Sequence, residues 1–125
     1  MRKLIFISML LLSACAARFS ETNYDRMVTL VVATRDPQTA CSTQDSMRST
    51  QRSMRSDAMH VLEHSQGRKD PEVTVMITAL MEEIDGFGKR LEAGNVSQFY
   101  CREKITNMNN GARAMLRAEG GKPRI

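Results

Sequence analysis

The chain has 125 residues, with 18 Lys and Arg against 14 Asp and Glu, and its formal net charge is +4. Acidic and basic residues are interleaved, Trp is absent, and aromatic residues make up 5% of the chain. It therefore lacks the basic patch and the stacking side chains of a nucleic-acid-binding protein, and we expect no nucleic-acid partner.

The first fourteen residues have the pattern of an export signal. Arg2 and Lys3 precede an uncharged apolar run over residues 4–12. This run is too short to cross a hydrocarbon core about 30 Å thick as a helix. A basic tip, a short apolar run and small residues after it are typical of a signal peptide that is removed. Removal of residues 1–14 lowers the formal net charge of the remainder to +2 and leaves enough residues for one domain.

The tetrad Leu12-Ser13-Ala14-Cys15, which ends this run, resembles the lipobox of bacterial lipoproteins. In that family Leu, a small residue and Ala precede a Cys, and all four positions match here. The resemblance implies that the signal is cleaved before Cys15 and that the cysteine carries palmitate-type acyl chains. Membrane lipid is then a partner of the chain, through acylated Cys15.

The residue after the cysteine bears on which membrane holds the protein. Ala16 stands where lipoproteins retained in the inner membrane of enteric bacteria usually carry Asp. The resemblance therefore implies a lipid anchor in the outer membrane, with the domain facing the periplasm. The alternative is an ordinary secretory signal that is cleaved near Ala16 or Ala17.

Cys41 and Cys101 are the two cysteines that remain, and the predicted compartment is oxidising. We expect them to form one disulfide. Closing a loop of about 60 residues stabilises a fold by about 4 kcal/mol in the chain-entropy model. The alternative is a pair of buried free thiols, which behave as small apolar side chains.

The first predicted helix begins near Thr22, which with Asp25 fits a capping box, and extends to about Arg35. The β-branched residues within Val28–Val32 leave a short strand as the alternative. Asp36-Pro37 then predicts an N-cap and the first residue of a second helix, which extends without Gly or Pro to about Ser65.

Asp70-Pro71 repeats this pattern and predicts the start of a third helix, which ends near Gly94. Asn95 with Gln98 is the predicted cap of a fourth helix. The third helix carries the most regular apolar face, with Val73, Ile77, Leu80, Ile84, Phe87 and Leu91. The corresponding face of the fourth helix contains Cys101, Ile105, Met108, Ala112 and Met115.

These elements predict an all-α fold, a small up-down bundle of three to four helices with one disulfide. Residues 15–21 are the lipidated cysteine and a short tether, 22–119 the helical domain, and 120–125 a flexible tail. In such a bundle the second and fourth helices are parallel, and both cysteines lie early in their helices. The disulfide and the bundle topology are therefore consistent with each other.

The second helix contains the candidate partner-binding residues. Met47 and Met54 share a narrow, polar stripe with Gln44 and Gln51, which is poor material for a core. Three arginines cluster around the stripe. We expect a half-exposed contact surface in which Met supplies apolar area and Arg supplies charge-assisted hydrogen bonds; its residues are Met47, Met54, Arg48, Arg52 and Arg55.

His60 and His64, four residues apart, provide the alternative site. Both rings can lie on one helix face, and nearby Met54 and Met59 would suit copper, with zinc as the other candidate ion. A third ligand is not evident, so we favour no metal and no other cofactor. We expect a non-catalytic protein-interaction module of the cell envelope, serving assembly, a secretion or conjugation apparatus, or exclusion of competitors. A periplasmic metal-binding protein is the alternative.

Overall fold

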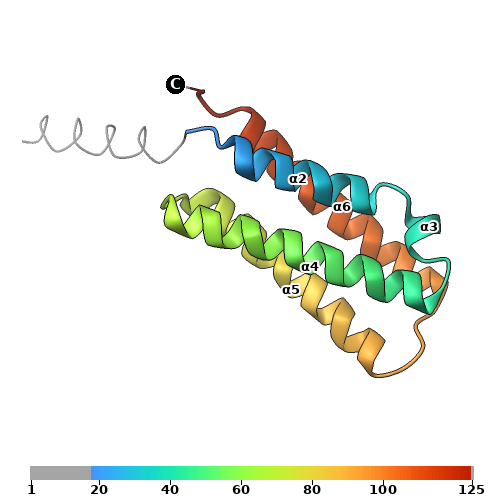
Figure 1. Cartoon of the computed structure of the whole chain (residues 1–125). Coiled ribbons are helices and arrows are strands. Elements are labelled where there is room, and N and C mark those ends of the chain that lie inside the picture. Colours follow the sequence, from blue (N-terminus) through green and yellow to red (C-terminus); the bar gives the residue numbers. More distant parts are fainter. Residues whose placement is uncertain (1–17, 125) are drawn as a thin grey trace, which may run out of the picture.

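The computed structural model describes residues 18–124, and its regular structure there is entirely helical. Consecutive long helices run in opposite directions and lie side by side (Figure 1). The predicted all-α, up-down bundle is confirmed, and the segment Val28–Val32 is helical. The helices are α2 (Glu21–Thr34), α3 (Pro37–Ala40), α4 (Gln44–Gly67), α5 (Pro71–Glu92) and α6 (Gln98–Gly120).

Each of these helices begins after a residue whose side chain accepts a backbone N–H of the first turn, as an N-cap does. Asp36 and Asp70 cap α3 and α5 as predicted, each followed by a proline at the first helical position. The predicted caps Thr22 and Asn95 are wrong. Ser20 caps α2 instead, by accepting from the N–H of Asn23 at 3.2 Å. Ser97 caps α6 in the same way.

The second predicted helix is divided in two, so the prediction of one continuous helix from Pro37 was wrong. The short helix α3 ends at Ala40, and α4 begins after a new cap, Thr43, whose hydroxyl accepts from the N–H of Ser46 at 3.0 Å. The hydroxyl of Ser42 donates to the carbonyl of Thr39. Such local side-chain bonds compete with helical hydrogen bonds and explain the break.

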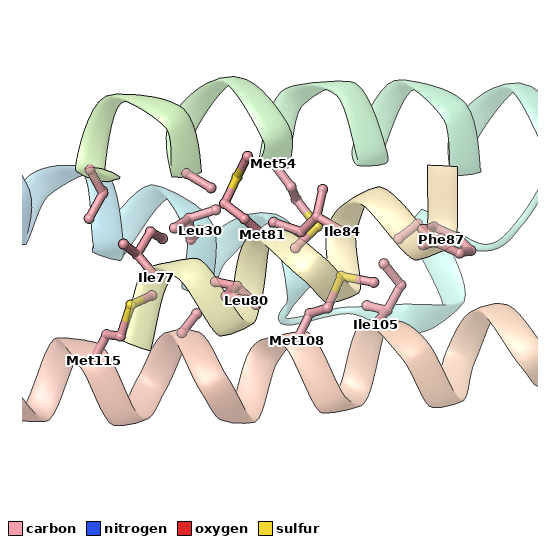
Figure 2. Packing of buried hydrophobic residues seen from close by; sticks show 14 of the residues in the cluster. Leu30, Met54, Ile77, Leu80, Met81, Ile84, Phe87, Ile105, Met108 and Met115 are labelled. Carbon is pink, nitrogen blue, oxygen red and sulfur yellow. The ribbon is translucent and has the colours of Figure 1, made fainter. Parts of the chain in front are cut away.

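The core fills the space between the four long helices (Figure 2). All the apolar positions predicted on α5 and α6 are buried, which confirms both faces. Methionine contributes much of the remaining volume, since its flexible side chain fills irregular gaps. The buried methionines are Met27, Met47, Met54, Met81, Met108 and Met115.

Cys41 and Cys101 form the predicted disulfide, with their Cα atoms 5.8 Å apart. It joins the α3–α4 connection to the first turn of α6. We call this end of the bundle, formed by α3 and the connections 41–43 and 93–97, the distal end. The opposite end, formed by residues 18–20, 68–70 and 121–124, is called the base. Within residues 18–124, no helix is long and apolar enough to cross a bilayer.

Candidate functional site

Cys15, the predicted lipidation site, lies outside the residues that the structure describes. The first described residues, Arg18 to Ser20, lead into α2 at the base. Figure 1 shows the end of α6 and the α4–α5 turn at this same end. Whatever precedes Arg18 is therefore joined to the bundle at its base.

A buried group of charges lies at the base. Glu119 is fully buried, and its carboxylate accepts from the Lys122 ammonium at 2.6 Å. Lys122 also contacts the buried carboxylate of Asp70. The backbone N–H of Ser20 donates to Glu119 at 2.6 Å, across 99 residues of sequence. Burial opposes the positive charge of Lys122, but its hydrogen bonds to Asp70 and Glu119 outweigh this and raise its pKa.

Polar side chains continue this group between α2 and α4. The hydroxyl of Ser20 lies 2.9 Å from Nε2 of His64, and the buried amide of Asn23 donates to the hydroxyl of Ser65 at 3.1 Å. The Ser65 hydroxyl in turn donates to a backbone carbonyl one turn earlier. We call Ser20, His64, Asp70, Glu119 and Lys122 the base cluster, because they connect the start of α2, the α4–α5 turn and the end of α6.

The two ends of the described segment, residues 18–124, also contact each other at the base. The N–H of Phe19 donates to the carbonyl of Pro123 at 2.8 Å, and the guanidinium of Arg124 lies 4.4 Å from the centre of the Phe19 ring. The prediction of a flexible tail over residues 120–125 is therefore wrong up to Arg124. It failed because the tail's partners, such as Asp70, are distant in sequence.

Met47 and Met54 were predicted to be half exposed, and the structure corrects this. Their side chains are 1% and 0% exposed, so neither is available to a partner in this fold. The two glutamines of their stripe form hydrogen bonds with backbone groups of other segments. The Gln44 side chain bonds both the N–H and the carbonyl of Val96, at 3.1 and 2.8 Å. The Gln51 amide donates to a carbonyl of α5 at 3.2 Å.

The three predicted arginines, which we call the arginine face, remain accessible on the side of α4 next to α5. Arg52 is exposed, and the side chains of Arg48 and Arg55 are 37% and 50% exposed. Arg55 pairs with Asp85 of α5 at 3.0 Å, and Arg48 lies 3.6 Å from Asp45. Exposed pairs of this kind contribute little to stability, so these guanidinium groups are able to exchange partners.

The two histidines have different surroundings. His60 is exposed, whereas His64 is half-buried and held by Ser20 in the base cluster. Within residues 18–124 no three His, Cys, Asp or Glu side chains are arranged to hold a metal ion. In this part of the chain the two histidines therefore have no third His, Cys, Asp or Glu ligand.

Sequence reasoning missed a hollow at the distal end, which we call the distal groove. It has a volume of about 500 Å³ and lies between the end of α2, α3 and the start of α4. No local motif marks it, because three separate segments form it. Its lining includes Val32, Ala33, Asp36, Thr39, Asp45 and Ser49.

No family model, curated protein or solved structure significantly matches this chain. The sequence resembles the lipoprotein class in the tetrad that ends at Cys15. In the described structure, residues 18–20 lead into α2 at the base, the arginine face lies along α4, and the distal groove lies at the opposite end.

Proposed function

We propose that this chain is a lipid-anchored protein of the bacterial cell envelope that binds a protein partner and catalyses no reaction. The carrying observation is the tetrad Leu12-Ser13-Ala14-Cys15, which ends an apolar run just ahead of the folded domain. Each acyl methylene buried in a bilayer contributes about 0.8 kcal/mol, and several chains together make the attachment stable. The outer membrane, facing the periplasm, is the proposed location.

The fold is compatible with a short tether between lipid and domain. Four residues separate Cys15 from Ser20, and an extended chain spans at most about 3.6 Å per residue. The base would then face the membrane. A helix of the length of α4 spans about 36 Å, so the distal end would point into the periplasm.

The accessible chemistry of α4 favours binding. Guanidinium groups form charge-assisted and often bidentate hydrogen bonds with carboxylates, which makes arginine frequent in protein interfaces. Arg48, Arg52 and Arg55 lie within two helical turns of each other on one side of α4. We therefore propose that the arginine face contacts acidic side chains of the partner.

Labelling with a palmitate analogue and membrane fractionation test the anchor. The chain should incorporate the label and sediment with the outer membrane, and Cys15→Ala should abolish both. As a matched control, Ser13→Ala keeps a small residue in the tetrad and should leave both unchanged. Unchanged processing and membrane attachment of Cys15→Ala would show that the proposed anchor is wrong.

A further inference from the structure

The distal groove is suited to a second contact, of opposite charge to the arginine face. Its apolar wall comes from Val32 and Ala33 at the end of α2 and from Ala40 of α3. Val32 is 52% exposed, and Val28, one turn earlier on the same side of α2, is 36% exposed. These valines extend the apolar wall along α2, so a ligand would cover side chains that are now in water.

The polar side of the groove carries negative charge. Asp36 and Asp45 line it, and none of its lining residues is basic. The Thr39 hydroxyl and N–H both donate to Asp36 and hold the pKa of that carboxyl below its usual range. The Asp45 side chain is 99% exposed and makes only a long pair, of 3.6 Å, with Arg48. Both carboxylates can therefore accept bonds from a cation.

Hydroxyl groups complete the lining. Thr39 of α3 and Ser46, Ser49 and Thr50 of α4 also line the groove. Hydroxyl oxygens accept hydrogen bonds from ammonium, guanidinium and peptide N–H groups. Acidic, hydroxyl and aliphatic side chains thus meet in one hollow, which is a suitable lining for an extended peptide with basic and aliphatic residues.

We propose that the distal groove binds a short segment of a partner protein in which Lys or Arg alternates with an aliphatic residue. The cationic group pairs with Asp36 and Asp45, and the aliphatic side chain packs on Val32 and Val28. This inference rests on the proposed function and deepens it, because it gives the partner's chemistry and its place. The groove is formed by the end of α2, α3 and the start of α4. These elements lie at the end of the bundle opposite the base (Figure 1), so an anchored domain would present the groove away from the membrane.

Fluorescence anisotropy tests the proposal with a labelled hexapeptide that alternates Lys and Val. The full chain is isolated in a neutral detergent, in the processed form that the host's membranes hold. We expect saturable binding that Asp36→Asn with Asp45→Asn weakens about tenfold, since two charge-assisted contacts are lost. Asn retains the cap of α3, so the double variant keeps its fold. A hexapeptide that alternates Glu and Val should not bind.

The matched control removes two other negative charges. Glu82 and Glu83 are exposed on α5 and border a different hollow. Glu82→Gln with Glu83→Gln should change the affinity less than about twofold, as expected for exposed charges remote from the peptide. Equal losses in both double variants, equal binding of the Glu peptide, or no saturable binding would overturn the proposal.

These experiments can refute the proposed anchor and the proposed groove independently of each other. Cys15→Ala should lose the membrane but bind the Lys peptide with unchanged affinity. If Cys15→Ala stays in the membrane while peptide binding behaves as expected, the proposed anchor is wrong and the groove stands. If the anchor is confirmed and the Asp36 and Asp45 changes have no effect, the groove proposal alone is wrong.

Discussion

Glu119, Asp70 and Lys122 place two negative charges and one positive charge where side chains are at most 8% exposed. Removing charges from water costs several kcal/mol per ion, so each must be paired and hydrogen-bonded. Here the ammonium binds both carboxylates, and Glu119 accepts a further bond from the N–H of Ser20. Loss of Lys122 would leave both carboxylates buried without a cation, whereas loss of one carboxylate would leave the other paired with Lys122.

Lys122→Met should therefore lower the free energy of unfolding by about 3–5 kcal/mol, because two carboxylates stay buried without their cation. Urea denaturation at neutral pH measures this loss. The matched control is Arg48→Met, which removes an exposed and long pair with Asp45 and should change stability by less than about 0.5 kcal/mol. If both variants lost a similar free energy of unfolding, burial would not be what makes the Lys122 ion pairs stabilising.

The same ion pairs predict how stability depends on alkaline pH. The pKa of Lys122 is raised in the folded chain above its ordinary value of 10.5. The stabilisation is therefore complete below pH 10.5 and is lost as the pH rises through the higher folded value. Denaturation of the wild-type chain across this range should show a fall that Lys122→Met lacks.

At the scale of elements, α4 has two flanks with different chemistry. Arg55 pairs with Asp85 on the flank next to α5, whereas Asp57 accepts from Arg26 on the flank next to α2. The distal groove lies on the second flank, whereas the arginine face includes Arg55 on the first flank and extends to Arg48, which lies 3.6 Å from the groove residue Asp45. Because the buried methionines lie between these flanks, one helix contributes to the core and to both proposed contact surfaces.

The start of α2 provides a prediction at this scale. Ser20→Ala should lower the free energy of unfolding by about 1 kcal/mol, through loss of the N-cap and of the contact with His64. Thr22→Ala, two residues later, should cost less than about 0.5 kcal/mol because Thr22 is exposed and is not the cap. Thermal unfolding followed by circular dichroism measures both; a larger loss for Thr22→Ala would restore the cap predicted from sequence.

At the scale of the whole molecule, the bundle is closed at both ends by links between residues distant in sequence. The disulfide joins positions 60 residues apart at the distal end. The base cluster joins Ser20 to Glu119 at the other end. These links restrain the helices where their own ends would otherwise fray.

The double substitution Cys41→Ser and Cys101→Ser should lower the free energy of unfolding by about 4 kcal/mol, by restoring the entropy of the unfolded chain. Denaturation in urea, without reductant, compares it with the wild type. Adding a reductant should lower the stability of the wild type by a similar amount and leave the double variant unchanged. A loss below about 1 kcal/mol would contradict the chain-entropy account of how this disulfide stabilises the fold.

The sequence by itself determined the helical class, the bundle topology, the apolar faces of α5 and α6, and the pairing of Cys41 with Cys101. Apolar periodicity, proline positions and cysteine count are local or compositional properties, and each was sufficient here. The tetrad ending at Cys15 likewise predicts an anchor without reference to the fold. These features can be predicted from sequence because each depends on residues close together in the chain, or, for the disulfide, on the fact that only two cysteines remain after Cys15.

Only the tertiary structure decided which polar residues are buried. The Met47 stripe is core because Gln44 finds a backbone partner 52 residues away, and the tail is held because Lys122 finds Asp70 at the same separation. The distal groove likewise forms from three segments. Sequence patterns describe the neighbours of a residue along one helix, whereas burial of a polar group depends on partners that folding brings to it from elsewhere in the chain.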